Sequence, residues 1–192
     1  MRLAILGGSF DPPHVGHLLV AQDACDQLGV DRLVFVPAAH QPLKSKGAAA
    51  SAGHRLAMVH LMAADDPRFD VSSMELDRGG LSFTVDTLTA FAAQHPGAEL
   101  LLLVGADVLD TFRQWRDPER ILGLATLVVV QRGEGAGATA SGSERMARLT
   151  TRRVDVSSTE IRERVRRGKS IRGFVTDAVA TYIAKNGLYR EG

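Results

Sequence analysis

Short runs of consecutive apolar residues recur along the chain, separated by stretches in which apolar and polar residues mix. Four such runs occupy residues 3–6, 33–36, 100–104 and 127–130. Each is rich in leucine or β-branched residues, and an uninterrupted apolar run of this length is typical of a strand buried on both faces of a parallel sheet. The runs therefore predict four strands of one parallel sheet.

The stretches between these runs show helical patterns. Apolar positions recur at helical spacing over residues 15–28, 54–64 and 83–94, and the third pattern stops at Pro96-Gly97. Strands that alternate with helices in this way favour an α/β fold. We expect a doubly wound, mostly parallel sheet of the Rossmann-like kind.

The pattern breaks at residues 133–143, whose sequence (GEGAGATASGS) has almost nothing to bury and predicts a mobile loop. The residues that follow predict a last strand, an arginine-bearing helix and a closing helix. Thr176 is suited to cap the closing helix, and Gly187 is suited to end it. Because this tail is too short for a second domain, we expect one domain over residues 1–192 with a small C-terminal helical part.

The composition is that of an ordinary soluble globule, with 45% apolar and 23% charged residues among 192, which excludes collagens, coiled coils and disordered tails. No run approaches the ~18 apolar residues that a membrane span needs. The apolar stretch at the N-terminus is too short for a signal peptide. Cys25 is the only cysteine, so no disulfide can form within the chain. These features predict a cytoplasmic protein that does not enter a membrane.

Positive charge is concentrated in one segment, although the net charge of the chain is only +1. Between Arg145 and Arg172, lysine and arginine outnumber the acidic residues ten to three. Such a patch on a nearly neutral protein points to a phosphate-bearing partner, with a solvated arginine-rich helix as the plain alternative. Because aromatic residues are not interleaved with these charges and no recognition motif is present, we expect no binding of DNA or RNA.

The first candidate site directly follows the first predicted strand, in the sequence Gly7-Gly8-Ser9-Phe10-Asp11-Pro12-Pro13-His14-Val15-Gly16-His17. Two glycines allow a tight turn and a close approach to a ligand, and Pro13 suits the first position of a helix. The N–H groups of that helix would face the carboxyl edge of the sheet, where α/β folds bind anions. His14 and His17 lie three residues apart on its first turn, and both can donate hydrogen bonds to phosphate.

A plain structural role or a metal site fits this motif less well than phosphate binding does. A histidine near a helix start is most often a cap or a surface residue, but two of them in phase behind a Gly-Gly turn favour a phosphate site. A metal site would lack the intervening Glu and a nearby third ligand. The Rossmann fingerprint G-x-G-x-x-G is absent, and Gly168-Lys169-Ser170 is no Walker loop because Glu163 stands where its first glycine is required.

A second phosphate site is predicted in the sequence Val156-Ser157-Ser158-Thr159-Glu160-Ile161-Arg162. Ser157 and Glu160 have the spacing of a capping box, so Ser157 is a natural N-cap. Arg162 and Arg166 lie one turn apart on the same side of the predicted helix. A helix start with arginines attached explains the basic patch better than nucleic acid does.

Taken together, the two motifs resemble those of a known enzyme family. GGSFDPPHVGH followed downstream by VSSTEIRERV is similar to the motif pair of the HIGH-type nucleotidyltransferase superfamily, and within it the chain resembles the bacterial nicotinate-nucleotide adenylyltransferases. Further matching segments spread over nearly the whole chain, at residues 81–84, 86–88, 104–107, 112–115 and 182–189. The resemblance implies a Rossmann-like nucleotidyltransferase fold.

The resemblance also implies a reaction, in which the phosphate of nicotinate mononucleotide attacks the α-phosphorus of ATP in line and gives deamido-NAD and pyrophosphate without a covalent enzyme intermediate. It implies that His14 and His17 are catalytic, holding the ATP phosphates while His17 stabilises the developing charge. Asp107 is implied to hold the ribose or the adenine. The other implied ATP contacts are Gly7, Gly8, Ser9, Phe10, Lys44, Gly105, Ser157, Ser158 and Arg162. Mg²⁺ is expected to arrive with ATP, held by phosphates and water rather than by a protein cage.

For the acceptor, the resemblance implies that the pyridine ring stacks on Trp115, the only tryptophan, for which a plain core role is the alternative. The backbone around Thr84 and Arg116 is implied to meet the carboxylate of the ring. A positive Arg116 suits a pocket that recognises an acid rather than an amide.

The chain departs from the family pattern in two loops. The family usually has Pro-Pro-His-Lys after the second strand, whereas this chain has Gln41-Pro42-Leu43-Lys44, which keeps the lysine and lacks the histidine. After the fourth strand, the family's Arg-Pro-Gly is replaced by Arg132 followed directly by Gly133.

Two other functions stay open at this point. A pantetheine-phosphate adenylyltransferase resembles the chain at both phosphate motifs but lacks the Thr84 and Trp115 segments. A non-catalytic nucleotide sensor would keep the binding site without the reaction. The sequence also leaves the oligomeric state open, homo-oligomers included.

Overall fold

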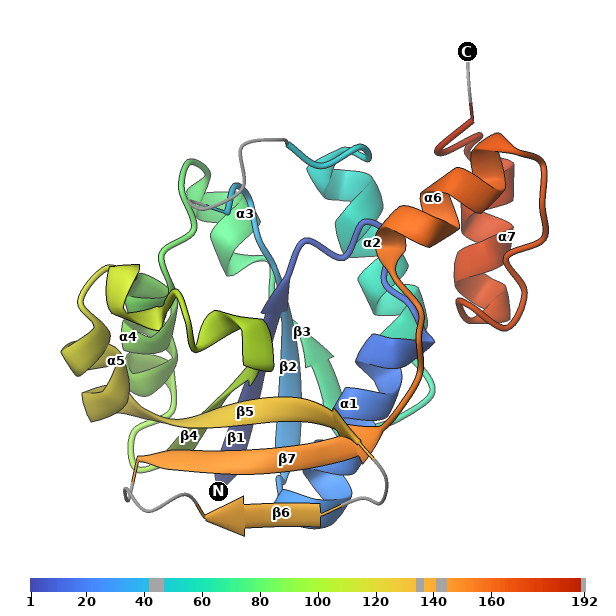
Figure 1. Cartoon of the computed structure of the whole chain (residues 1–192). Coiled ribbons are helices and arrows are strands. Elements are labelled where there is room, and N and C mark those ends of the chain that lie inside the picture. Colours follow the sequence, from blue (N-terminus) through green and yellow to red (C-terminus); the bar gives the residue numbers. More distant parts are fainter. Residues whose placement is uncertain (42–46, 134–136, 141–144, 191–192) are drawn as a thin grey trace.

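The computed structural model describes residues 1–41, 47–133, 137–140 and 145–190. A seven-stranded sheet forms its centre (Figure 1). In spatial order the strands are β3 (Phe69–Val71), β2 (Arg32–Pro37), β1 (Arg2–Gly8), β4 (Glu99–Gly105), β5 (Ala125–Gly133), β7 (Met146–Arg152) and β6 (Gly137–Ala140). All neighbours pair in parallel except β6, which runs antiparallel to β7 at the edge. The doubly wound, mostly parallel sheet predicted from the sequence is confirmed.

The direction of strand addition reverses at β1. From β1 the chain proceeds to β2 and β3 on one side, and then crosses to β4, β5 and β7 on the other. Sheets of this kind bind ligands at the carboxyl ends of the strands beside the reversal, because the connecting loops diverge there. The carboxyl ends of β1 and β4, at Gly8 and Gly105, therefore mark the expected site.

Residues along each central strand alternate between two cores, one on each face of the sheet. In β1, Ala4 and Leu6 belong to one core, and Leu3 and Ile5 to the other. The first core includes residues of α1 (Val15–Leu28), α2 (Ala52–Ala63), α6 (Ser158–Arg166) and α7 (Asp177–Lys185). The second includes residues of α4 (Thr84–Gln94) and α5 (Pro118–Leu124). Burial on both faces explains why these strands have uninterrupted apolar sequences.

The helices predicted from periodicity are confirmed. α1 has the predicted bounds, α4 begins one residue late after its N-cap Phe83, and α2 begins two residues early. In the tail, Thr176 caps α7 as predicted, and Gly187 takes a left-handed φ of 61° just beyond its end. Within the described ranges, none of the helices has both the length and the apolarity to cross a membrane.

Several short elements were not predicted, among them β3, α5 and α3 (Met74–Arg78). The prediction of a loop over residues 133–143 is corrected by β6, because Gly137–Ala140 pairs with β7 and Gly133 ends β5. Backbone pairing along a sheet edge needs no apolar side chain, so a glycine- and alanine-rich strand leaves no apolar pattern to detect. The rest of the predicted loop, residues 134–136 and 141–143, lies outside the described residues.

Candidate active site

The loop that follows β1 is anchored by a buried aromatic ring. Gly7 and Gly8 end the strand, and a Cβ on Gly8 would lie only 3.1 Å from the ring of Phe10. Phe10 packs edge-on against Phe35 and His17, with ring centroids 5.9 Å and 4.9 Å apart. Its side chain is buried, so any contact of Phe10 with a nucleotide would involve its backbone. The ring ties the loop to the core of the sheet and to the first turn of α1.

The two predicted histidines lie at the start of α1 with stacked rings, whose centroids are 3.7 Å apart. His14 is the N-cap residue, and its backbone N–H donates to Nδ1 of His17 at 3.1 Å. Because this Nδ1 accepts, the proton of the neutral His17 ring is on Nε2, which can serve as a hydrogen-bond donor. A Cβ on Gly16 would lie 3.0 Å from Nδ1 of His14. A glycine between the histidines therefore leaves room for the stacked rings.

Two predictions about this helix start need correction. Pro13 precedes the N-cap residue and so lies outside the helix rather than at its first position. The backbone N–H of Val15, expected to face an anion, instead donates to the carbonyl oxygen of Phe174 at 3.0 Å. The turn between α6 and α7 therefore occupies this N–H group, and an anion here would depend more on the imidazoles than on the helix N-terminus.

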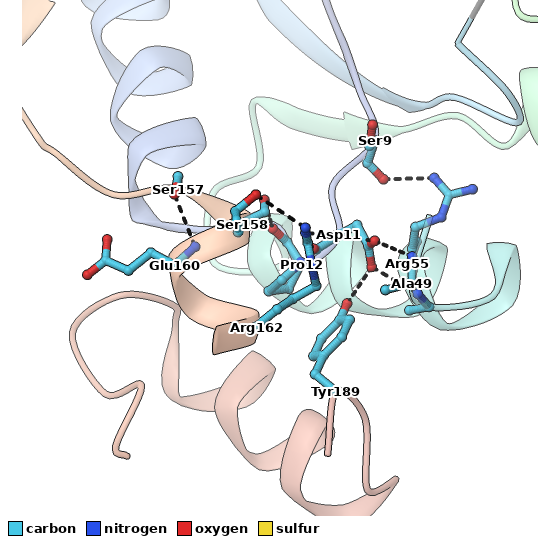
Figure 2. Close-up of polar contacts among 12 residues, drawn as sticks. Ser9, Asp11, Pro12, Ala49, Arg55, Ser157, Ser158, Glu160, Arg162 and Tyr189 are labelled. Atoms are coloured by element: carbon cyan, nitrogen blue, oxygen red, sulfur yellow. Dashed lines mark hydrogen bonds and ion pairs between the residues drawn. The ribbon is translucent and has the colours of Figure 1, made fainter. Parts of the chain in front are cut away.

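The second predicted phosphate segment packs against the loop after β1 (Figure 2). Ser157 is the N-cap of α6 as predicted, and its Oγ accepts from the N–H of Glu160 at 3.1 Å. Ser158 Oγ donates to the carbonyl oxygen of Pro12 at 2.8 Å, across 146 positions of the chain. Arg162 likewise donates from Nη1 to the carbonyl oxygen of Asp11 at 2.7 Å. The fold thus brings the two predicted phosphate motifs together.

Arg166 does not take part in this assembly. It forms an ion pair with Glu163 at 3.1 Å and lines a separate groove of about 800 Å³ between α6 and α7. Arg166 lies one turn beyond Arg162 in α6, as predicted, but its guanidinium pairs with Glu163 instead of joining the contacts to the loop after β1. As far as the structure describes the lining of that groove, it contains none of the residues implied to bind substrate.

A cavity of about 410 Å³ opens at the carboxyl ends of β1 and β4, beside the reversal of the sheet. Its lining residues are Leu6, His17, Val20, Val104, Gly105, Ala106, Asp107 and Val130. A Cβ on Gly105 would clash with the carboxylate of Asp107, so this glycine allows Asp107 to fold back over the end of β4. Apolar walls with one imidazole and one carboxylate suit a ligand that has an aromatic base and polar groups attached to it.

Of the predicted acceptor residues, Arg116 contacts the start of α4. Thr84 is the first residue of that helix, and Trp115 and Arg116 follow a 3-10 helix (Phe112–Gln114). The Arg116 guanidinium lies over the ring of Phe83, 4.8 Å from its centroid, and forms an ion pair with Asp86 at 3.4 Å. In the free protein the charge predicted to meet a ring carboxylate is therefore paired with a carboxylate of the chain itself.

Trp115 is half-buried and packs at a tilt against Phe112, with ring centroids 5.6 Å apart. Both rings adjoin the core that includes α4 and α5. This position is compatible with the plain core role as well as with a ring that receives a ligand. Lys44, implied to add charge to the triphosphate, lies outside the described residues.

Sequence reasoning missed a pair of buried charges beside the loop after β1. Asp11 is 4% exposed and Arg55 of α2 is 3% exposed. Arg55 donates to the carbonyl oxygen of Ser9 at 2.7 Å. Burial lowers the pKa of the Arg55 guanidinium, and the charge of Asp11 acts in the opposite direction. One signal could have revealed Arg55: it is in phase with the buried Met58 and Met62, which places a charge on the apolar face of a helix.

Comparison with known proteins gives consistent results. Residues 5–164 match the model of the cytidylyltransferase-like family. A curated protein of Gemmatimonas aurantiaca, named "Probable nicotinate-nucleotide adenylyltransferase", is 54% identical, with 100% of this chain and 93% of that protein covered. One of the same name from Thermus thermophilus is 45% identical, with 99% and 100% covered. Among solved structures, Plasmodium falciparum nicotinic acid mononucleotide adenylyltransferase complexed with NaAD shares the fold, with a TM-score of 0.78 at 18% identity over 98% of this chain and 97% of that one.

Proposed function

The chain belongs to the cytidylyltransferase-like family and, within it, to the nicotinate-nucleotide adenylyltransferases, and we propose that it transfers the adenylyl group of ATP to nicotinate mononucleotide. An oxygen of the mononucleotide phosphate forms a bond to the α-phosphorus of ATP while the bond from that phosphorus to the pyrophosphate oxygen breaks. The products are deamido-NAD and pyrophosphate. Such a transfer needs reactants held in line and stabilisation of the developing charge, and it needs no covalent intermediate.

The observation that supports this proposal best is the position of the stacked histidines beside the cavity at the reversal of the sheet. His17 lines that cavity together with Gly105 and Asp107. Adenine and ribose occupy the cavity near Asp107, so the phosphates lie at the start of α1. The Nε2–H group of His17 then donates to phosphate oxygens as negative charge accumulates on them, which is where a preorganised donor has most effect.

The start of α6 supplies further donors to the triphosphate. Arg162 uses Nη1 for the loop and Nη2 for the hydroxyl of Thr159 at 3.2 Å. A guanidinium has five N–H donors, so it can hold the loop and still meet a phosphate. Ser157 and Ser158 lie beside it at the N-terminus of α6. In this function, Arg162 joins the two phosphate motifs and also neutralises charge on the nucleotide.

ATP would bring Mg²⁺ with it. Among the described residues, no group of three or more His, Cys, Asp or Glu side chains is arranged to hold a metal ion. Mg²⁺ needs few protein ligands, because it is usually bound through substrate phosphates and water, so the triphosphate would supply most of its ligands here. The chemistry that the ion would supply is neutralisation of negative charge on the departing pyrophosphate.

The acceptor binds at the start of α4. Its pyridine ring stacks on Trp115, and its carboxylate meets the backbone near Thr84 and the guanidinium of Arg116. Residues 1–192 form one domain in this proposal, which is supported by the first of the two cores, because it contains both Ala4 of β1 and Val179 of α7. A cytoplasmic location is supported by Cys25, which is buried as a free thiol.

Pyrophosphate release from ATP tests the proposal, with nicotinate mononucleotide, nicotinamide mononucleotide and phosphopantetheine supplied as separate acceptors. We expect the highest kcat/KM with nicotinate mononucleotide and no turnover with phosphopantetheine. Preference for phosphopantetheine would assign the chain to the other adenylyltransferase class. ATP binding without pyrophosphate release for any acceptor would assign it to nucleotide sensors.

A further inference from the structure

A buried carboxylate joins the loop after β1 to two distant segments of the chain. Asp11 accepts hydrogen bonds from the backbone N–H groups of Ala49 at 2.6 Å and Ala50 at 3.1 Å. It also accepts one from the hydroxyl of Tyr189 at 2.8 Å, across 178 positions of the chain. Ala49 and Ala50 precede α2, and Tyr189 lies beyond the end of α7. Figure 2 shows the contacts of Asp11 with Ala49 and Tyr189. None of these contacts has a part in the substrate binding proposed above.

The charges around Asp11 favour a fixed arrangement. A carboxylate withdrawn from water needs its oxygens hydrogen-bonded, because an unsatisfied buried charge is strongly unfavourable. Arg162 Nη1 lies 4.0 Å from Asp11 Oδ2, which adds an opposite charge. Burial, followed by the hydrogen bond to Asp11, raises the pKa of the Tyr189 hydroxyl. Tyr189 therefore remains a neutral donor at physiological pH.

The position of Asp11 is transmitted to the histidines through a short, stiff link. Only Pro12 and Pro13 separate Asp11 from His14, and each proline has a fixed φ angle. The C-terminal part of the chain holds both ends of this link. Tyr189 binds Asp11 at one end, and the carbonyl oxygen of Phe174 accepts from the N–H of Val15 at the other.

We propose that Asp11 and Tyr189 are positioning residues, which hold the loop after β1 so that the imidazole of His17 stays aligned with the reacting phosphates. This inference rests on the proposed function. Loss of the Tyr189 hydroxyl leaves Asp11 with its two backbone donors, and the loop gains freedom to shift. A displaced imidazole still meets ATP in the ground state but stabilises the transition state less well, so kcat falls more than affinity for ATP.

The chain has two tyrosines, which gives the test a matched control. The hydroxyl of Tyr182 in α7 bonds to Nδ1 of His54 at 2.9 Å, away from the loop. We expect Tyr189→Phe to lower kcat about tenfold or more while KM for ATP changes by less than about threefold. Tyr182→Phe also removes one tyrosine hydroxyl from the C-terminal part of the chain, but that hydroxyl does not contact the loop. The kcat of Tyr182→Phe should therefore stay within about twofold of wild type. Equal kcat in the two variants would overturn the proposal.

A double-mutant cycle separates positioning of His17 from general loss of stability. In a His17→Ala background, Tyr189→Phe has no imidazole left to misplace, so we expect a further change in kcat of less than about twofold. If Tyr189→Phe instead caused a general structural defect, kcat of the double variant would fall by the product of the two single-variant factors. The same factor in both backgrounds would therefore contradict the proposal, even if Tyr189→Phe alone lowers kcat.

A spectroscopic measurement keeps this inference separate from the proposed function. The ¹⁵N resonances of the histidine rings report the environment and tautomer of His17 without any turnover. We expect Tyr189→Phe to shift the His17 resonances and Tyr182→Phe to leave them in place. A wild-type protein that releases no pyrophosphate defeats the proposed function, whereas unchanged His17 resonances in Tyr189→Phe defeat the positioning role.

Discussion

The two sides of the candidate site differ in how deeply their side chains are buried and in how many hydrogen bonds fix them. The side proposed to bind ATP, called the ATP side, comprises the loop after β1 with the starts of α1 and α6. There His14 is 7% exposed, and hydrogen bonds from five segments of the chain converge. The side proposed to bind the acceptor, called the acceptor side, comprises the start of α4 and residues 115–116. There the Arg116 side chain is 58% exposed and that of its partner Asp86 is 40% exposed. The ATP side is therefore preorganised, whereas the acceptor side can rearrange.

The difference follows the chemistry expected on each side. An exposed ion pair such as Arg116–Asp86 contributes about 0–1 kcal/mol, so a ligand carboxylate can replace Asp86 at little cost. A buried charge such as that of Asp11 cannot exchange partners in this way, because it would be left unsatisfied. We therefore expect substitutions on the ATP side to lower kcat, and substitutions on the acceptor side to change KM and selectivity.

The largest effect is expected for His17→Ala. The variant loses a donor that matters most as charge builds on the phosphates, so kcat should fall about 10²–10³-fold, or about 3–4 kcal/mol, with a smaller change in KM for ATP. Steady-state pyrophosphate release measures both constants. Near-normal turnover would show that His17 has no catalytic part.

Gly16→Ala should have the next largest effect, because it probes the stacked histidines without removing them. The added methyl group would lie 3.0 Å from Nδ1 of His14, so the ring must move and we expect kcat to fall about tenfold. Alanine is also a better helix former than glycine, so the melting temperature should not fall.

Gly53→Ala provides the control for this substitution. Gly53 has the same place, second in its helix, as Gly16 has in α1, and a Cβ there meets no atom within 4 Å. We expect Gly53→Ala to raise the melting temperature slightly and to leave kcat unchanged. If Gly16→Ala kept full activity, the ATP side would be less tightly packed than the comparison requires.

Trp115→Ala should lower kcat/KM for nicotinate mononucleotide and for nicotinamide mononucleotide by about the same factor. Aromatic contacts of this kind contribute about 0.5–1.5 kcal/mol beyond buried area, so we expect kcat/KM to fall roughly three- to tenfold for each acceptor. The ratio of the two values is the critical measurement. A changed ratio would mean that Trp115 takes part in discrimination and does not act as a stacking face alone.

The smallest effects are expected at Arg116 and Asp86. Arg116→Ala should lower kcat/KM for the acid about two- to fivefold and leave the amide unchanged, because charge-assisted hydrogen bonds are stronger than neutral ones. Asp86→Asn should raise kcat/KM for the acid, since it frees Arg116 for the ligand carboxylate. If Arg116→Ala leaves the ratio of acid to amide unchanged, discrimination lies with the backbone near Thr84.

The same contrast explains how much the sequence could predict. The central strands were found because burial on both faces produces uninterrupted apolar runs, and the cap of α6 was found because Ser157 and Glu160 interact locally. Short elements such as β3, with three residues, are too brief to show a period. β6 is an edge strand of Gly, Ala and Thr residues held by backbone pairing with β7, so its sequence shows no apolar pattern.

The contacts that organise the ATP side could not be read from local patterns. Tyr189 and Asp11 are neighbours only after the whole chain has folded, and no spacing rule links residues 178 positions apart. Ser158 and Arg162 were expected to bind the triphosphate, and local patterns gave no sign that both hold the loop after β1, as the structure shows. Arg116 had its expected charge, but its partner Asp86 appears only when α4 and the segment after the 3-10 helix pack together.

Backbone hydrogen exchange followed by mass spectrometry tests the contrast between the two sides most directly. The free protein is compared with the protein bound to nicotinate mononucleotide and a non-hydrolysable ATP analogue. We predict that residues 9–17 and 158–162 exchange slowly in both states, whereas residues 83–86 and 112–116 exchange fast when free and slow down on binding. Fast exchange of residues 9–17 in the free protein, with protection only after the ATP analogue binds, would contradict a preorganised ATP side.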